Sequence, residues 1–316
     1  MELGYHLSCE EHHPDDLVRY AVRAEEAGFT YALISDHFHP WLPMQGQSPF
    51  VWGVIGAISQ ATRRLRLGTG VTCPTVRIHP VIVAQAAATA AVMMPDRFFL
   101  GVGSGENLNE HVVGAKWPPS SVRLDLLAEA IEVIRRLWTG EQVSYGGNFF
   151  TVEDARLYTL PDEPPPLHVA GMGPDAVRLA GRAGDGLITI VPEADLVRGF
   201  RDAGGTGKPT FAKLTVCWSE DEEEARETAR RYFGVAGLGR LNTELRTPED
   251  FQLALATMTD EAAIGGIVTE PDPDVHATAI RDIADAGFSH VYVHQVGPDQ
   301  EGFLDFYTRE VVPKLH

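Results

Sequence analysis

The stretch YALISDHFHPWLPMQGQSPFVWGVIGAISQATRRLRLGTGV, residues 31–71, contains one complete strand–helix–strand unit. The runs YALIS at 31–35 and RLRLGTGV at 64–71 are short and rich in β-favouring residues, and the longer apolar stretch at 48–62 between them is typical of a helix. Two strands that are joined by a helix pair in parallel, because the crossover returns the chain to the same end of the sheet. This unit therefore predicts an α/β protein with a parallel sheet.

The same alternation recurs along the whole chain. Strand-like runs lie at 3–8, 31–35, 64–71, 97–103, 167–171, 186–190, 211–219 and 290–295, and helical stretches follow them. Eight such units predict an α/β fold of the TIM (β/α)8 barrel type, as a single domain over residues 1–316, with an open doubly wound sheet as the alternative. Since such barrels need about 250 residues, we expect insertions: a hairpin-bearing one near 144–166 and a helical or irregular one near 233–262. Residues 265–270 could add a short strand.

The charge balance limits the choice of partners. The chain has 316 residues with 44 Asp and Glu against 26 Lys and Arg, a formal net charge of −18. Such a surface repels polyanions, so we expect a small-molecule substrate and neither nucleic acid nor a membrane as partner. The cysteines Cys9, Cys73 and Cys217 have no CxxC spacing, and no apolar run is long enough to span a membrane. These features predict a cytoplasmic protein.

Side chains that follow the strands of a barrel share one mouth, so the candidate site is sought there. The loop SDHFHPW at 35–41 contributes Asp36, His37 and Trp41, and the loop after the fourth strand contributes Glu106. Taken alone, a histidine in such a loop is more often a packing residue than a catalyst. An acid, an imidazole, an indole and a further carboxylate in one mouth favour acid–base chemistry.

Glycines precede a helix after the fifth strand. In AGMGPDA at 170–176 they stand just before Pro174, where a helix is expected to begin. The free backbone amides at such an N-terminus can bind an anion without any positive side chain. An ordinary Gly-Pro helix start is the alternative interpretation.

A metal site is a further alternative. His37 and His39 form an HxH pair, and His294 follows the last strand, a combination that a metal-dependent barrel hydrolase could use. No HxxxH or HxxE companion accompanies the pair, so the sequence favours a site without a metal.

Several segments, in order along nearly the whole chain, resemble the luciferase-like flavin and deazaflavin oxidoreductases, and in particular their coenzyme F420-dependent branch. The segments are SDHFHPW (35–41), GTGVTCPT (68–75), FFLGVGSGENLNE (98–110), AGRAGDG (180–186) and HQVGPDQEGFLDFY (294–307). The resemblance implies a homodimeric oxidoreductase that transfers a hydride between F420 and a hydroxyl or carbonyl substrate. An FMN-dependent monooxygenase or reductase of the same family is the alternative.

The resemblance also implies roles for individual residues. His37 would accept the proton of the substrate hydroxyl, and Asp36 would orient its imidazole or tune its basicity. Glu106 would supply a proton to the ring, and Trp41 would wall the site and stabilise charge. A non-proline cis peptide is implied at Gly70–Val71. The implied cofactor-binding residues are Asp36, Gly70, Val71, Cys73, Gly105, Glu106, Asn109, Ala170, Gly171, Met172 and Gly173.

After the sixth strand this sequence differs from the sugar-phosphate enzymes of this branch. Those enzymes hold the phosphate with hydroxyl and ammonium groups, whereas GLITIVPEADL at 186–196 offers Ile190 and Glu193. An apolar side chain and a carboxylate disfavour a phosphate dianion. We therefore expect a neutral alcohol, carbonyl or sugar-like substrate instead of a sugar phosphate.

Overall fold

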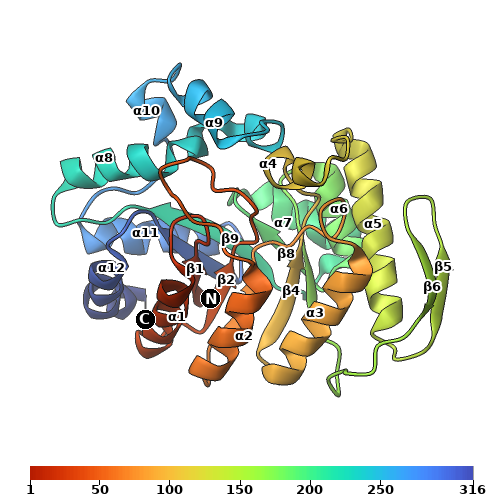
Figure 1. Ribbon diagram of the computed structural model, residues 1–316. Coiled ribbons are helices and arrows are strands. Elements are labelled where there is room, and N and C mark those ends of the chain that lie inside the picture. Colours follow the sequence, from red (N-terminus) through yellow and green to blue (C-terminus); the bar gives the residue numbers. More distant parts are fainter. Residues whose placement is uncertain (316) are drawn as a thin grey trace.

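Eight parallel strands close into a barrel in the computed structural model, which describes residues 1–315 (Figure 1). In order around the barrel they are β1 (Glu2–Leu7), β10 (His290–Gln295), β9 (Thr210–Val216), β8 (Gly186–Thr189), β7 (Leu167–Ala170), β4 (Phe98–Val102), β3 (Arg66–Thr69) and β2 (Tyr31–Ile34). All eight predicted strands are present, and the closed barrel excludes the open doubly wound sheet.

Helices surround the barrel and bury its outward-facing apolar side chains. They are α1 (Pro14–Glu26), α2 (Val51–Ala61), α3 (Pro80–Met93), α5 (Ser120–Leu137), α6 (Pro174–Ala183), α7 (Ala194–Phe200), α8 (Glu222–Phe233), α11 (Pro273–Asp285) and α12 (Gln300–Phe306). Helix α1 shows how the local sequence sets its ends. His13 caps it by accepting a hydrogen bond from the N–H of Asp15, Pro14 occupies the first turn, and Gly28 follows with a φ of 89°.

Both predicted insertions are present. Strands β5 (Val143–Gly146) and β6 (Thr151–Ala155) form an antiparallel hairpin on the flank of the barrel. The second insertion contains a 3-10 segment (Gly234–Thr243), α9 (Pro248–Leu255) and α10 (Asp260–Ala263), and it lies at the same end of the barrel as the short helix α4 (Asn107–Glu110) (Figure 1). The extra strand expected at 265–270 is wrong: only Val268 pairs, in an isolated bridge with Val216.

The interior of the barrel has an apolar layer at the amino ends of the strands and a polar layer above it. In the apolar layer Tyr31, Phe99 and Phe211 pack together. The centroid of the His168 ring lies 5.2 Å from that of Phe99 and 5.0 Å from that of Phe211. This layer closes the amino end. The polar groups therefore gather at the carboxyl end, where a substrate can enter. Within residues 1–315 no helix is long and apolar enough to cross a membrane.

Candidate active site

His37 lies between two carboxylates that come from different strands. Its Nε2 is 3.2 Å from Oε1 of Glu10, in the loop after β1, and 3.5 Å from Oε2 of Glu106, in the loop after β4. The Trp41 ring is tilted against the imidazole, with centroids 4.8 Å apart. The structure thus brings together His37, Glu106 and Trp41 as the sequence predicted, and it adds Glu10.

The hydrogen bonds of the imidazole indicate which nitrogen is free to react. Nδ1 of His37 is 3.1 Å from the carbonyl oxygen of His39, a contact in which Nδ1 must carry the proton. Nε2 is then the nitrogen that takes up and releases a proton, and it faces both carboxylates. This arrangement suits a general base whose product cation is stabilised by a neighbouring anion.

The two carboxylates differ in how readily they hold a proton. Burial raises the pKa of Glu106, and attraction to His37 opposes this rise only in part. Burial also acts on Glu10, but His37, the hydroxyl of Ser35 and His6 together lower its pKa to about 2. Near neutral pH Glu10 is therefore a fixed negative charge, and Glu106 is the carboxyl that can carry a proton.

The expected role of Asp36 is wrong in one respect. Its carboxylate does not contact the imidazole of His37: Oδ2 accepts a hydrogen bond of 2.7 Å from the hydroxyl of Thr72, and Oδ1 accepts one of 2.8 Å from Arg77. Asp36 instead ties the loop after β2 to the loop after β3, and Glu10 makes the contact with the imidazole. Adjacent residues at a strand end point in different directions, which explains why the sequence neighbour is not the partner.

The residues predicted to bind the cofactor ring form one wall of the mouth. The peptide Gly70–Val71 is cis, as the resemblance implied. A Cβ atom placed on Gly105 would lie 2.6 Å from Sγ of Cys73, and burial raises the pKa of that thiol, which stays protonated. The side-chain oxygen of Asn109 accepts a hydrogen bond of 2.9 Å from the N–H of Phe38, in the loop after β2. This closely packed, glycine-lined backbone fits a flat ring, and the individual contacts remain predictions.

The glycine segment after β7 fits an anionic group. Gly173 is the N-cap of α6, no side chain caps this helix, and a Cβ atom added to Gly173 would meet nothing within 4 Å. The N–H of Gly171 is already bonded to the carbonyl of Ile188 at 2.9 Å, and Pro174 has no N–H. The amides left to bind a ligand are therefore those of Met172, Gly173, Asp175 and Ala176. Such a site can hold the phosphate of a cofactor despite the negative charge of the chain.

Lys213 is a candidate site residue that the sequence reasoning missed. It belongs to β9, where Ala212, Leu214 and Val216 face the helices and Phe211 and Lys213 face the barrel interior. Burial lowers the pKa of Lys213 to about 8, opposed by attraction to Glu10, Glu106 and Glu11. Successive side chains of a strand point to opposite faces, so the position of the lysine in TFAKLTV could have predicted that it points into the barrel.

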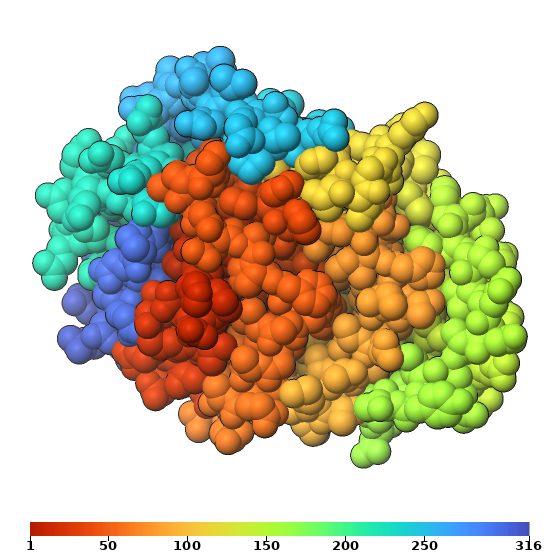
Figure 2. Space-filling view, viewed as in Figure 1, coloured from red at the N-terminus to blue at the C-terminus, as the bar shows by residue number. Residues whose placement is uncertain are grey.

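The second insertion covers the mouth. Phe251 of α9 packs edge-on against Trp41 with centroids 5.3 Å apart, and Glu244 accepts hydrogen bonds from Nε1 of Trp117 at 3.2 Å and from Arg123 at 3.1 Å. Figure 2 shows the blue residues of this insertion directly against the orange segment around residue 45 and the yellow segment around residue 115. The insertion therefore restricts access of water to the site.

The histidines of the hydrolase alternative do not converge. Nδ1 of His39 lies 3.0 Å from the carbonyl of Leu108, whereas Nε2 of His294 lies 3.3 Å from Glu11. Over residues 1–315 no group of three or more His, Cys, Asp or Glu side chains has an arrangement that could hold a metal ion. The geometry thus gives the hydrolase alternative no support.

Comparisons with known proteins decide the family. The model of the luciferase-like monooxygenase family matches residues 1–290. The chain belongs to this family. The chain is 36% identical to a protein of Microbacterium testaceum (strain StLB037) named F420-dependent glucose-6-phosphate dehydrogenase, over all of this chain and 97% of the relative, and 37% identical to the protein of that name from Beutenbergia cavernae, with the same coverage.

Solved structures of the family agree with this result. An F420-dependent secondary alcohol dehydrogenase in complex with an F420–acetone adduct superposes with a TM-score of 0.93 at 32% identity, over all of this chain and 99% of the other. The oxygenating constituent of 3,6-diketocamphane monooxygenase from Pseudomonas putida, in complex with FMN, reaches a TM-score of 0.74 at 18% identity, again over all of this chain and 99% of the other. The latter likeness shows the shared fold alone.

Proposed function

We propose that this protein is a coenzyme F420-dependent dehydrogenase or reductase that acts on a neutral alcohol or carbonyl compound. The observation that carries the proposal is the position of His37, which lies between Glu10 and Glu106 and beside Trp41 at the mouth of the barrel. The choice of cofactor is supported by the full-length relatives named as F420-dependent dehydrogenases and by the similar structure that contains an F420–acetone adduct.

The residues of the chain divide the work of such a reaction. F420, when bound, supplies a ring carbon that accepts or donates a hydride. Nε2 of His37 takes the proton of the substrate hydroxyl, and Glu10 stabilises the imidazolium that results. Glu106, whose raised pKa favours the protonated form, would supply a proton at the site proposed for the ring. Trp41 and the insertion above it keep water away from the reacting atoms.

The surroundings of the mouth favour an uncharged substrate. Ile190 follows β8 and is 49% exposed, and Glu193 is the N-cap of α7. Lys213, the cation that faces the interior here, is already surrounded by carboxylates. A phosphate dianion would meet these negative charges, whereas a hydroxyl or carbonyl group would not. The secondary alcohol named for the structural neighbour agrees with this proposal.

We also infer a cytoplasmic homodimer. The three cysteines are buried free thiols, which suits a reducing compartment. Phe50, Ile82, Val92 and Met93, at or within α2 and α3, have exposed apolar side chains, and a second copy could cover them. Light scattering after gel filtration would distinguish a dimer from a monomer.

A cofactor titration followed by a substrate screen tests the proposal. We expect F420 to bind with a saturable change in its absorbance, FMN to bind far more weakly, and secondary alcohols to reduce bound F420. Glucose 6-phosphate should give no saturation. Tight FMN binding without F420 binding would overturn the choice of cofactor, and a micromolar constant for glucose 6-phosphate would overturn the choice of substrate.

A further inference from the structure

A continuous series of hydrogen-bonding side chains leads away from His37. Oε1 of Glu10 is 3.2 Å from Nε2 of His37, and Oε2 of the same carboxylate accepts a hydrogen bond of 3.0 Å from the hydroxyl of Ser8. That hydroxyl is also 3.2 Å from Oε1 of Glu11. Ser8 has one proton and two carboxylate neighbours, so its hydroxyl can donate to either of them in turn.

The series is enclosed along its length and opens only at its end. Ser8 and Glu10 are each 3% exposed, and the side chain of Glu11 is 1% exposed. Beyond Glu11 lies a pocket of about 210 Å³, lined by Glu11, His12, Asp16, Tyr20, Met44, Gln45, Tyr232, Gly297 and Pro298. Its volume and its polar lining are sufficient for several water molecules.

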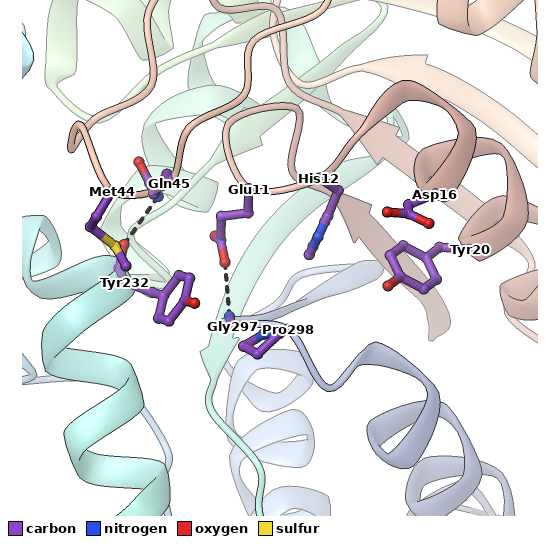
Figure 3. Close-up of a pocket in the computed structure, with 9 residues that line it drawn as sticks. All are labelled: Glu11, His12, Asp16, Tyr20, Met44, Gln45, Tyr232, Gly297 and Pro298. Atoms are coloured by element: carbon purple, nitrogen blue, oxygen red, sulfur yellow. Dashed lines mark hydrogen bonds between the residues drawn. The ribbon is translucent and has the colours of Figure 1, made fainter.

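Figure 3 shows how Glu11 and His12 enter this pocket from the same loop. Oε2 of Glu11 accepts a hydrogen bond of 2.8 Å from the N–H of Gly297, which fixes the carboxylate at the inner wall. The ring of His12 packs edge-on against Tyr20, with centroids 5.1 Å apart, and burial lowers its pKa.

We propose that Glu10, Ser8 and Glu11 form a proton relay that connects His37 with water in this pocket. The proposal rests on the proposed role of His37 as the general base. After each oxidation His37 holds a proton that it must lose before it can act again, and the enclosed side chains carry that proton to the surface without opening the substrate site to water.

The step balances without any redox partner. Nε2 of His37 gives its proton to Oε1 of Glu10, and the neutral carboxyl makes a half-turn that presents the proton to Ser8. The Ser8 oxygen accepts this proton while its own proton passes to Oε1 of Glu11. Glu11 then releases a proton to pocket water, and only O–H and N–H bonds have formed or broken.

The charges around Glu11 suit a group that both accepts and releases a proton. Burial raises the pKa of Glu11 to about 7, opposed by His12 and the N–H of Gly297 and assisted by Glu10. His294 lies 3.3 Å away but is itself kept uncharged by burial, and attraction to Glu11 opposes the lowering of the Lys213 pKa. Near neutral pH both forms of Glu11 are populated.

The low pKa of Glu10 does not prevent transfer. With a pKa of about 2, the protonated form at pH 7 is populated by a factor of about 10⁵ less than the carboxylate. A prefactor of about 6 × 10¹² s⁻¹ multiplied by this population gives an upper limit of about 6 × 10⁷ passages per second, compared with a usual turnover of about 1 to 10³ s⁻¹.

Proton exchange at His37 in the cofactor-free protein tests the relay directly. The protein is labelled with ¹⁵N at histidine. The rate at which the Nε2 proton of His37 exchanges with water is measured by NMR on the imidazolium form, because Nε2 carries a proton only in that form when Nδ1 donates to the carbonyl of His39. We expect this rate to fall at least tenfold in Glu11→Gln and in Ser8→Ala. Asp16→Asn is the control, because Asp16 lines the pocket outside the hydrogen-bonded series, and its rate should stay within twofold of the wild type.

Unchanged exchange in Glu11→Gln and Ser8→Ala would overturn the relay, as would an equal loss in Asp16→Asn. Either folded variant suffices if the other does not fold. The exchange measurements do not involve F420. If the protein failed to reduce F420, the proposed function would be refuted, but the exchange rates would still show whether the relay exists.

With the loaded enzyme, Glu11→Gln should lower steady-state turnover about tenfold and leave single-turnover hydride transfer within twofold. Added imidazole should restore turnover in the variant and have no effect on the wild type. Loss of the single-turnover rate would instead indicate a damaged active site and would contradict the relay.

Discussion

Nε2 of His37 lies 3.2 Å from Oε1 of Glu10, although the two residues follow different strands of the barrel. Glu10 has a pKa of about 2 and is ionised throughout the neutral range. The imidazole therefore meets a negative charge on the side of the nitrogen that accepts a proton. This pairing places an anion beside the nitrogen that would receive the proton of a substrate hydroxyl.

Replacing Glu10 with Gln should slow catalysis without weakening cofactor binding. The variant keeps the size of the side chain but removes the charge that stabilises the imidazolium. A hydrogen bond to a charged group contributes about 1.5–3 kcal/mol, so kcat should fall about 10- to 100-fold. Steady-state kinetics and a fluorescence titration with F420 measure the two quantities. An unchanged kcat would remove Glu10 from the proposed mechanism.

Replacing His37 with Ala should lower kcat about 10²- to 10⁴-fold, because a positioned general base contributes a factor of this size. The dissociation constant for F420 should change far less. His39→Ala is the matched control on the same loop, since the His39 ring contacts the carbonyl of Leu108 and not the carboxylates. Equal losses of turnover and cofactor affinity in His37→Ala would contradict the assignment of His37 as the base.

Replacing Glu244 with Ala should loosen the insertion that covers the site. Glu244 accepts hydrogen bonds from Trp117 and Arg123, and its loss removes both at a cost of about 1 kcal/mol. We expect faster amide hydrogen exchange in residues 234–263 and a KM several-fold higher, with kcat less affected. Glu244→Gln keeps one acceptor oxygen for these two donors and should show a smaller change than Glu244→Ala. Unaltered exchange in Glu244→Ala would show that other contacts hold the insertion.

The sequence predicted the barrel well because strand–helix alternation is a local pattern. Each strand of the barrel could be recognised from its own residues, as in YALIS before Asp36. The contact between His37 and Glu10 could not be recognised in this way, because it depends on how two loops from neighbouring strands meet. The resemblance implied Asp36 as the residue that acts on His37, but Arg77 and Thr72 bind that carboxylate.

The position of the second insertion is another feature that local patterns leave open. Its composition marked residues 233–262 as irregular, but its place over the mouth depends on contacts such as that between Phe251 and Trp41. Lys213 is a different case. Its inward position follows from the alternation of β9, so a residue-by-residue reading of that strand predicts a cation inside the barrel.

Replacing Lys213 with Met should weaken substrate binding and change the pH dependence. Nζ of Lys213 lies 4.8 Å from the centroid of the Phe233 ring and faces the interior, where it can donate a hydrogen bond to a substrate oxygen. Its pKa of about 8 means that the charge is present below pH 8 and lost above it. The kcat/KM of the wild type should fall above about pH 8, and that fall should be absent from Lys213→Met. An identical alkaline limb in both proteins would exclude Lys213 as its source.

Glu11 should make the wild type less stable as the pH rises towards neutrality. Its pKa is about 7 in the folded protein and 4.5 as the ordinary value, so between these values the folded state binds one proton more than the unfolded state. The stability that Glu11 contributes is therefore fully present below pH 4.5 and is lost as the pH rises to 7. The free energy of unfolding falls by at most about 3 kcal/mol, because the pKa differs by about 2.5 between the two states and each pKa unit corresponds to about 1.36 kcal/mol. The free energy of unfolding, measured with urea from pH 5 to 8, should show this decline in the wild type and a flatter profile in Glu11→Gln. Parallel profiles would mean that Glu11 has its ordinary pKa in the folded protein despite its burial.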